Sequence, residues 1–242
     1  MRNVVVTGGS RGLGLGIARR LAGAGYRAIA VARKPTEDLT AAIAEAPPGA
    51  LRFVACDLAE IDGLAGLAKT IRKEFGPIYG LVNNAGMSFE GVLALMPIAQ
   101  MEQMLRLNTL APMVLTKHVV RQMMADGGGG RIVNMASVIA STGYSGLSVY
   151  AASKASLLGF SRSLAREVGR LGVTVNSVAP GFIETEMTKG LSEEQRGQIE
   201  RRSALKRLAG VEDVAGAVEF LLSDSAKNIT GTVVTVDAGN TA

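Results

Sequence analysis

The chain has 242 residues, of which 48% are hydrophobic, 19% are charged and 4% are aromatic, and it contains no tryptophan. A chain of this length and composition buries one sizeable core, so we expect residues 1–242 to form a single domain. The formal net charge is +5, but the basic residues are scattered among acidic ones, and few aromatic side chains are available to stack on bases. The composition therefore argues against nucleic-acid binding.

Single cysteine and histidine residues restrict the chemistry of the chain. Cys56 alone excludes an intramolecular disulfide, and His118 alone cannot build a His/Cys metal cluster or a Ser-His-Asp triad, so we expect no metal site. Apolar stretches end well before the roughly 20 residues that a membrane helix needs. Met1 to Asn3 lead directly into an apolar run without a signal peptide. We expect a cytoplasmic protein with no membrane partner.

Seven short apolar or β-branched runs recur along the chain, separated by segments with helical spacing. They lie at residues 4–6, 28–31, 51–54, 79–82, 132–135, 173–175 and 233–236. Strands buried on both faces read as continuous apolar runs, so this alternation predicts a parallel sheet covered by helices. The expected fold is α/β, a Rossmann-like doubly wound parallel sheet of about seven strands with helices on both faces. The longest helices are expected at about 98–125 and 149–170.

A glycine-rich turn follows the first predicted strand, from Thr7 to Gly14, and a helical run begins after it. Glycines allow a tight turn, and the N-terminus of the helix presents free N–H groups and a positive dipole end to a pyrophosphate. The turn therefore predicts a dinucleotide site. Close packing of a strand against a helix, which also needs glycine, is the alternative interpretation.

The residues after the second predicted strand favour NADP over NAD. An NAD-selective site usually carries an acidic residue there, which holds the ribose hydroxyls. This chain has Ala32, Arg33 and Lys34 instead. Arg33 can clamp a 2′-phosphate, and Arg11 in the glycine-rich turn can reach the same group. We expect NADPH or NADP+ as the cofactor; solvated surface arginines are the alternative.

A tyrosine and a lysine stand four residues apart where a long helix is expected to begin. Tyr150 and Lys154 share a helix face, and Ser137 precedes them at the end of a predicted strand. A phenol with a pKa near 10 is a poor acid at neutral pH unless a neighbouring cation lowers that pKa. We therefore expect Lys154 to lower the pKa of Tyr150 and to make it a proton donor. An ordinary surface pair is the alternative.

In combination, these motifs resemble the short-chain dehydrogenase/reductase family over essentially the whole chain. The resemblance is carried by the Thr7 to Gly14 turn, Cys56-Asp57-Leu58, Asn83-Asn84-Ala85-Gly86, Asn108, Ser137, Tyr150, Lys154, and Pro180-Gly181 with Thr185. It implies a catalytic set of Asn108, Ser137, Tyr150 and Lys154. It implies cofactor contacts from Gly8, Ser10, Arg11, Gly12, Leu13, Gly14, Arg33, Asp57, Leu58, Asn83, Ala85, Gly86, Tyr150, Lys154, Pro180, Gly181, Ile183 and Thr185.

The resemblance also assigns individual roles. It implies that Asp57 contacts the adenine, that Asn83 and Ala85 border the adenosine ribose and the cofactor, and that Thr185 holds the nicotinamide carboxamide. It implies a direct hydride transfer from the nicotinamide to a carbonyl carbon. Ser137 would bind the carbonyl oxygen, Tyr150 would donate the proton, Lys154 would also bind the nicotinamide ribose, and Asn108 would hold a water in a proton relay.

Within the family, the segments from Ser161 to Val168 and from Pro180 to Thr185 resemble 3-oxoacyl-acyl-carrier-protein reductases of fatty acid biosynthesis. The resemblance implies a homotetramer that reduces a 3-oxoacyl thioester of a carrier protein or of CoA. Such reductases often carry a basic residue before the strand that ends at the catalytic serine. Here Asp126 and four glycines occupy that place. Such reductases often carry a second basic residue at the end of the long helix, where this chain has Arg170 followed by Leu171. Acyl-CoA and a free ketone therefore remain alternatives to a carrier-bound substrate.

Three other functions remain alternatives at this stage. A general carbonyl reductase or an alcohol or polyol dehydrogenase would use the same catalytic set. A non-catalytic dinucleotide-binding sensor would share the fold, but all four members of the catalytic set are present.

The segment from Pro180 to Leu208 is polar and lies between two predicted strands, and Ser192, Glu193 and Glu194 are typical of a helix start. We interpret about 180–208 as a lid over the substrate site; a plain surface excursion is the alternative.

Overall fold

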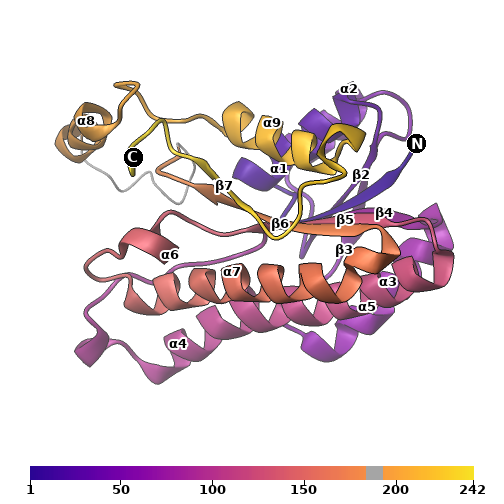
Figure 1. Cartoon of the computed structure of the whole chain (residues 1–242), viewed down its shortest axis with the longest axis horizontal. Coiled ribbons are helices and arrows are strands. Elements are labelled where there is room, and N and C mark those ends of the chain that lie inside the picture. Colours follow the sequence, from indigo (N-terminus) through magenta and orange to yellow (C-terminus); the bar gives the residue numbers. More distant parts are fainter. Residues whose placement is uncertain (184–192) are drawn as a thin grey trace.

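The computed structural model describes residues 1–183 and 193–242, which form a sheet between two layers of helices (Figure 1). Within these residues, seven parallel strands pair in the order β3-β2-β1-β4-β5-β6-β7. The strands are β1 (Asn3–Thr7), β2 (Arg27–Ala32), β3 (Leu51–Ala55), β4 (Ile78–Asn83), β5 (Gly130–Met135), β6 (Val173–Pro180) and β7 (Val233–Val236). Each predicted apolar run lies in one strand, which confirms the doubly wound α/β fold.

The helices cover both faces of the sheet. They are α1 (Gly12–Gly23), α2 (Glu37–Glu45), α3 (Leu64–Phe75), α4 (Ile98–Leu105), α5 (Ala111–Asp126), α6 (Ile139–Thr142), α7 (Ser148–Val168), α8 (Glu193–Arg202) and α9 (Val211–Leu222). Figure 1 shows α1, α2 and α9 above the sheet and α3, α5 and α7 below it. None of the helices in the described part of the chain has the length and apolar character needed to cross a membrane.

The central strand β1 feeds both cores. Val4 and Val6 are buried with the apolar residues of α1, α2 and α9, whereas Val5 is buried with those of α3, α5 and α7. Successive side chains of a strand point to opposite faces, so a strand covered on both sides needs an unbroken apolar run. This is why the sequence shows continuous runs in place of alternation.

The helix predicted at about 98–125 is confirmed as a helical segment, but it is not uniform. It consists of α4, a π-helical stretch at Arg106–Leu110, and α5, which has a proline in its first turn. π-Helical bulges are rare and often mark functional sites. Asn108 lies in this stretch and is buried. The helix predicted at about 149–170 is α7, followed by one 3-10 turn to Leu171.

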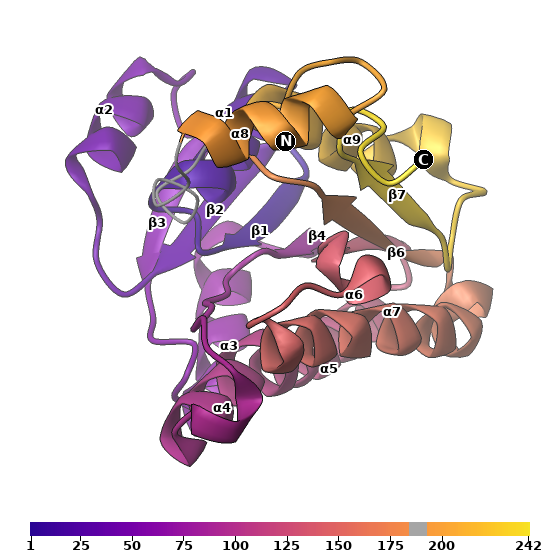
Figure 2. The same ribbon diagram turned by 90° about the vertical axis from the view of Figure 1, so that its left-hand side faces the viewer.

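The strand order reverses between β1 and β4, so the helices that follow these two strands leave on opposite faces of the sheet. Ligands of such folds bind beside the carboxyl ends of the strands at this point. Figure 2 views the molecule from this end, where α6 and α8 lie and which the chain terminus at Ala242 also approaches. The functional site is therefore expected at this end of the sheet.

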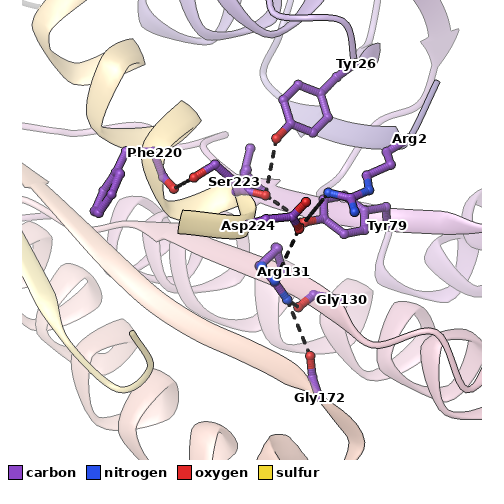
Figure 3. Close-up of polar contacts among 10 residues, drawn as sticks. Arg2, Tyr26, Tyr79, Gly130, Arg131, Gly172, Phe220, Ser223 and Asp224 are labelled. Atoms are coloured by element: carbon purple, nitrogen blue, oxygen red, sulfur yellow. Dashed lines mark hydrogen bonds and ion pairs between the residues drawn. The ribbon is translucent and has the colours of Figure 1, made fainter. Parts of the chain in front are cut away.

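The opposite end of the sheet is closed by a polar cluster around the last turn of α9 (Figure 3). The hydroxyl groups of Tyr79 and Tyr26 donate to the carbonyl oxygen of the last residue of α9, at 2.7 and 3.3 Å. Arg2 donates to Asp224 at 2.9 Å, and Arg2 and Arg131 flank the Tyr79 ring. Donors and cations stabilise the carboxyl end of a helix. The cluster thus explains why Arg131 is buried, and its role is structural.

Candidate active site

The glycine-rich turn is compact because its glycines touch one another. A Cβ on Gly14 would lie 2.2 Å from the carbonyl oxygen of Gly8 and 2.5 Å from the amide nitrogen of the Asn84 side chain. Gly8 has a φ of +67° and donates its N–H to Val31 of β2 at 2.8 Å. α1 begins at Gly12, so the free N–H groups of its first turn face the carboxyl end of the sheet. The cradle fits a pyrophosphate.

The threonine that precedes these glycines links two strands. Thr7 Oγ1 donates to the carbonyl of Val82 at 3.2 Å and accepts from the backbone N–H groups of Asn84 and Ala85, at 2.9 and 3.0 Å. Asn84 Nδ2 donates back to the Thr7 carbonyl at 2.9 Å. The Asn-Asn-Ala-Gly segment is thereby fixed against the glycine-rich turn.

The side predicted for adenosine brings together some of the expected residues. Thr7, Leu58, Asn83 and Ala85 line one small cavity. Within the described residues, Asn83 Oδ1 is buried without a hydrogen-bond partner. Buried polar atoms are normally satisfied, so Asn83 Oδ1 is left as an acceptor for a ligand or a water. Asp57, in contrast, is exposed, and its carboxylate accepts from the N–H of Ala59 at 3.0 Å.

The two arginines expected at a 2′-phosphate lie on neighbouring loops. Arg33 directly follows β2, and Arg11 precedes α1; both are exposed. The loops are tied together by Thr36, whose hydroxyl donates to the carbonyl of Ser10 at 2.5 Å. Thr36 also caps α2 by accepting from Leu39 N at 3.2 Å. Arg33 therefore lies at the end of β2, and the bond from Thr36 to Ser10 holds the loop that precedes α1 beside it.

Ser137 and Tyr150 meet at the carboxyl end of β5. Ser137 lies two residues after the end of that strand, and Tyr150 lies in the first turn of α7. Interaction with the Ser137 hydroxyl lowers the pKa of Tyr150. Burial raises the pKa of Tyr150 above its ordinary 10.0 and outweighs this interaction. The prediction that Lys154 lowers the pKa of Tyr150 below its ordinary value is therefore wrong for this structure, because removal of the phenol from water dominates.

Lys154 lies one turn after Tyr150 and is almost fully buried. Its Nζ is 5.9 Å from the centre of the Tyr150 ring and donates to the carbonyl of Met135 at 2.8 Å. Burial lowers the pKa of Lys154 from 10.5 to about 8. Removing an ammonium group from water disfavours its charged form, so the cation at neutral pH is held at a free-energy cost. Such perturbed groups concentrate at functional sites.

Asn108 joins the same group through its side chain. Its amide nitrogen donates to the Met87 carbonyl at 2.8 Å and to the Ser153 hydroxyl at 3.0 Å, and its oxygen accepts from Met87 N–H at 2.9 Å. A Cβ on Gly86 would lie 3.3 Å from both Asn108 Oδ1 and Lys154 Nζ. Asn108, Ser137, Tyr150 and Lys154 are thus brought together. In the described residues, no three metal-binding side chains form a cluster.

Comparison with known proteins agrees with this geometry. A family model described as enoyl-(acyl carrier protein) reductase matches residues 8–241. The chain is 40% identical over 235 residues to the 3-oxoacyl-[acyl-carrier-protein] reductase FabG of Escherichia coli K12, covering 97% of this chain and 95% of the relative. It is 40% identical over 234 residues to the human 3-oxoacyl-[acyl-carrier-protein] reductase, with the same coverage.

Solved structures give the same result. A short-chain dehydrogenase/reductase variant from Serratia marcescens is 30% identical, with a TM-score of 0.91 over 100% of this chain and 98% of that one. A short-chain type dehydrogenase/reductase from Mycobacterium ulcerans is 33% identical, with a TM-score of 0.92 over 99% and 89%. The chain belongs to the short-chain dehydrogenase/reductase family. It is an oxidoreductase of that family, and the family uses a nicotinamide dinucleotide, which the glycine cradle fits.

In this short-chain dehydrogenase/reductase, the last predicted cofactor segment is only partly described. Pro180 ends β6, and its carbonyl accepts from the N–H of Val138 at 3.0 Å, which joins the segment to the residue after Ser137. A Cβ on Gly181 would lie 2.6 Å from the Cβ of Asp237, and Ile183 is buried. Thr185 lies outside the described residues, as does part of the lid predicted at about 180–208.

Three contributors to the site of this short-chain dehydrogenase/reductase were not anticipated from the sequence. Thr7 fixes the segment after β4, the Met135 carbonyl holds Lys154, and the Ser153 hydroxyl accepts from Asn108 and donates to the Tyr150 carbonyl at 2.7 Å. Ser153 and Thr7 adjoin residues singled out as functional, and that adjacency was the available signal. A backbone carbonyl leaves no signal in a sequence.

Proposed function

We propose that this enzyme reduces the ketone of a 3-oxoacyl thioester to a 3-hydroxyacyl thioester, using NADPH. The observation that carries the proposal is the position of Tyr150 between the Ser137 hydroxyl, which lowers its pKa, and the buried ammonium group of Lys154, 5.9 Å from its ring. The relatives named 3-oxoacyl-[acyl-carrier-protein] reductase, at 40% identity over nearly the whole chain, support the substrate class.

Each residue has a defined part in this reaction. When bound, the reduced nicotinamide supplies the hydride that adds to the carbonyl carbon. The hydroxyls of Ser137 and Tyr150 donate hydrogen bonds to the carbonyl oxygen, where negative charge develops. Tyr150 then releases its proton to that oxygen, which completes the alcohol and leaves a phenolate. The cation of Lys154 stabilises the phenolate electrostatically. We assign Asn108 to the path that returns a proton to this phenolate.

Preference for NADPH rests on the cations of the two neighbouring loops. A charge-assisted contact with the 2′-phosphate contributes about 1.5–3 kcal/mol, and each 1.4 kcal/mol changes an affinity tenfold. Arg33→Ala should therefore reduce the NADPH-to-NADH ratio of kcat/KM by at least about tenfold. Lys34→Ala, at the next exposed position, is the matched control. An unchanged ratio in Arg33→Ala would remove the argument for NADPH.

A thioester is favoured over a free ketone by the charge around α8. The segment from α8 to the next helix contains Arg196, Arg201, Arg202, Lys206 and Arg207 against Glu193, Glu194 and Glu200. CoA and the phosphopantetheine of a carrier protein both bear phosphate. An exposed cationic rim attracts such groups through interactions that weaken as salt rises.

The test compares three substrates in an NADPH oxidation assay. Acetoacetyl-CoA should be reduced, with a kcat/KM that falls as ionic strength rises. Ethyl acetoacetate, an uncharged 3-oxo ester, should be a poorer substrate whose kcat/KM does not change with salt. Crotonoyl-CoA carries the same phosphates but offers a C=C bond in place of the ketone, and should not be reduced.

Three results would replace the proposal. Parallel salt profiles with a preference for the ester would leave a general carbonyl reductase, the second function that the catalytic set supports. Oxidation of secondary alcohols or polyols in preference to ketone reduction would indicate a dehydrogenase instead. A titration in which NADPH binds without turnover of any ketone would support a dinucleotide sensor.

The remaining parts of the proposal concern organisation. We infer that residues 1–242 act as one domain, with the segment at about 180–208 over the substrate, and that the enzyme is a cytoplasmic homotetramer. The substrate partner is a carrier protein or CoA; no nucleic-acid or membrane partner is proposed. Sedimentation of the purified enzyme tests the tetramer directly.

A further inference from the structure

A chain of hydrogen-bonded polar side chains crosses the centre of the molecule beneath α7. Asn83 Nδ2 of β4 donates to Thr116 Oγ1 of α5 at 2.9 Å and to Asn134 Oδ1 of β5 at 2.8 Å. Asn134 Nδ2 donates to Ser161 Oγ of α7 at 2.8 Å, and Ser161 bonds to Ser177 of β6 at 2.9 Å. All five side chains are at most 3% exposed.

The chain is unusual because its surroundings are apolar. Ile132, Val133 and Met135 of β5 are buried as ordinary core residues. A buried polar group without partners costs about 1–3 kcal/mol, and satisfied pairs give little net stability compared with a packed apolar side chain. Stability alone therefore does not explain Asn134. A fully satisfied polar pair does fix one arrangement of two elements, since any sliding breaks its bonds.

The elements that this pair fixes are those that hold the buried lysine. Asn134 precedes Met135, whose carbonyl accepts from Lys154 Nζ at 2.8 Å. Ser161 follows Lys154 by about two helical turns, so both side chains lie on the face of α7 that covers the sheet. The bond from Asn134 to Ser161 and the bond from Lys154 to Met135 thus join the same helix to the same strand at neighbouring points.

We propose that Asn134 and Ser161 are positioning residues that hold Lys154 at the Met135 carbonyl, within reach of Tyr150. Neither contacts the glycine-rich turn or the Ser137 hydroxyl through a hydrogen bond in the described residues. Their effect on reduction is indirect and rests on the proposed function. Their effect on Lys154 itself does not, and can be measured without a substrate.

The environment of Lys154 makes this effect measurable as a titration. Tyr150, on the same helix, is a titratable group whose ring centre lies 5.9 Å from Lys154 Nζ. The facing strands β5 and β6 have no acidic residues, and α6 is uncharged. Arg131 lies at the far end of β5, while Glu102 of α4 and Arg106 after it are exposed. Burial is the cause of the lowered pKa of Lys154, so a looser α7 that admits water should raise that pKa toward 10.5.

The test variant is Asn134→Val, and the chain offers a matched control. Val suits a strand, and its introduction leaves Asn83 bonded to Thr116 and Ser161 bonded to Ser177. The control is Asn176→Val on β6. Asn176 is also fully buried, but it donates to the carbonyl of Ile229 at 2.8 Å and accepts from Thr232 N at 3.2 Å, away from α7. Both variants should lose stability in a urea titration.

The first readout uses no substrate. In protein labelled with ¹³C-lysine, with the Lys154 signal assigned from Lys154→Met, we expect Asn134→Val to raise the pKa of Lys154 by at least about half a pH unit. Asn176→Val should leave that pKa within error of the wild type. Ser161→Ala should act in the same direction as Asn134→Val. An unchanged Lys154 titration in both Asn134→Val and Ser161→Ala would overturn the proposal.

The second readout is turnover. We expect Asn134→Val to lower kcat for acetoacetyl-CoA at least about tenfold and to shift the alkaline limb of its pH profile upward, with the KM for NADPH nearly unchanged. Asn176→Val should keep the wild-type profile, and the double variant of Asn134 and Ser161 should be no worse than Asn134→Val alone. An equal loss of kcat in Asn176→Val would show that Asn134 and Ser161 have only a structural role. A wild type inactive on acetoacetyl-CoA refutes the proposed function only, because the lysine titration still decides the positioning.

Discussion

Replacing the buried lysine should make the protein more stable at neutral pH while it abolishes catalysis. Lys154 is 5% exposed, and burial lowers its pKa from 10.5 to about 8. Methionine has a similar length and no charge, so Lys154→Met removes the buried ammonium group without opening a large cavity. The variant therefore separates what the lysine contributes to stability from what it contributes to chemistry.

The magnitude follows from the pKa. At 1.36 kcal/mol per pH unit, a fall from 10.5 to about 8 corresponds to about 3.4 kcal/mol of destabilisation of the charged form. Lys154→Met removes this cost but loses the hydrogen bond to Met135, which contributes about 1 kcal/mol. At pH 7 the variant should be more stable than the wild type by about 2 kcal/mol.

The difference in the free energy of unfolding between Lys154→Met and the wild type changes sign as the pH rises. Below pH 8 the lysine is protonated in both the folded and the unfolded chain, and the wild type bears the full free-energy cost of burying the charged ammonium group. Between pH 8 and 10.5 the unfolded chain binds a proton that the folded chain has released, so the free energy of unfolding of the wild type rises with pH. Above pH 10.5 the cost has vanished, and the variant should be the less stable protein by about 1 kcal/mol.

The assay is urea unfolding of the cofactor-free proteins, followed by circular dichroism at pH 7, 8, 9 and 10. Lys117→Met, on the exposed face of α5, controls for the loss of one positive charge. A Lys154→Met variant that is less stable at pH 7, with a difference that does not change up to pH 10, would refute the reasoning about burial.

Two further substitutions test local geometry. Gly14→Ala should lower NADPH affinity at least about tenfold, because its Cβ would lie 2.2 Å from the carbonyl oxygen of Gly8. Gly23→Ala, in the same helix with nothing within 4 Å, should bind normally, and equal affinities by calorimetry would contradict the cradle. Tyr79→Phe should lose about 1 kcal/mol of stability with its 2.7 Å hydrogen bond. Tyr26→Phe, whose bond is 3.3 Å, should lose less in urea titrations, and the reverse order would contradict the capping account.

The sequence predicted the fold because the inner strands of the sheet are buried on both faces. Val4 to Val6 show this directly, since the continuous run follows from the two cores that the strand feeds. The π-helical stretch around Asn108 could not be predicted, because the apolar spacing on either side of it is ordinary helical spacing. Its presence depends on packing against Met87 and Ser153, which come from distant parts of the chain.

The candidate site was predictable where its chemistry lies in side chains close in sequence. Tyr150 and Lys154 are one turn apart, and their partnership follows from helix geometry. Their protonation equilibria were not predictable, because they depend on burial. The expectation for Tyr150 considered the cation and omitted the desolvation that raises its pKa. The bond from Asn134 to Ser161 joins residues 27 positions apart and needed the structure.

The most direct test of the central claim is a paired measurement on Tyr150→Phe. The substitution removes the proton donor and keeps the ring that fills the site. We expect reduction of acetoacetyl-CoA to fall by about 10²–10⁴-fold while the Kd for NADPH stays within about twofold of the wild type, because a general acid contributes to the barrier and not to cofactor binding. A variant that binds NADPH normally and retains more than about a tenth of the wild-type rate would contradict the role of Tyr150 as the proton donor.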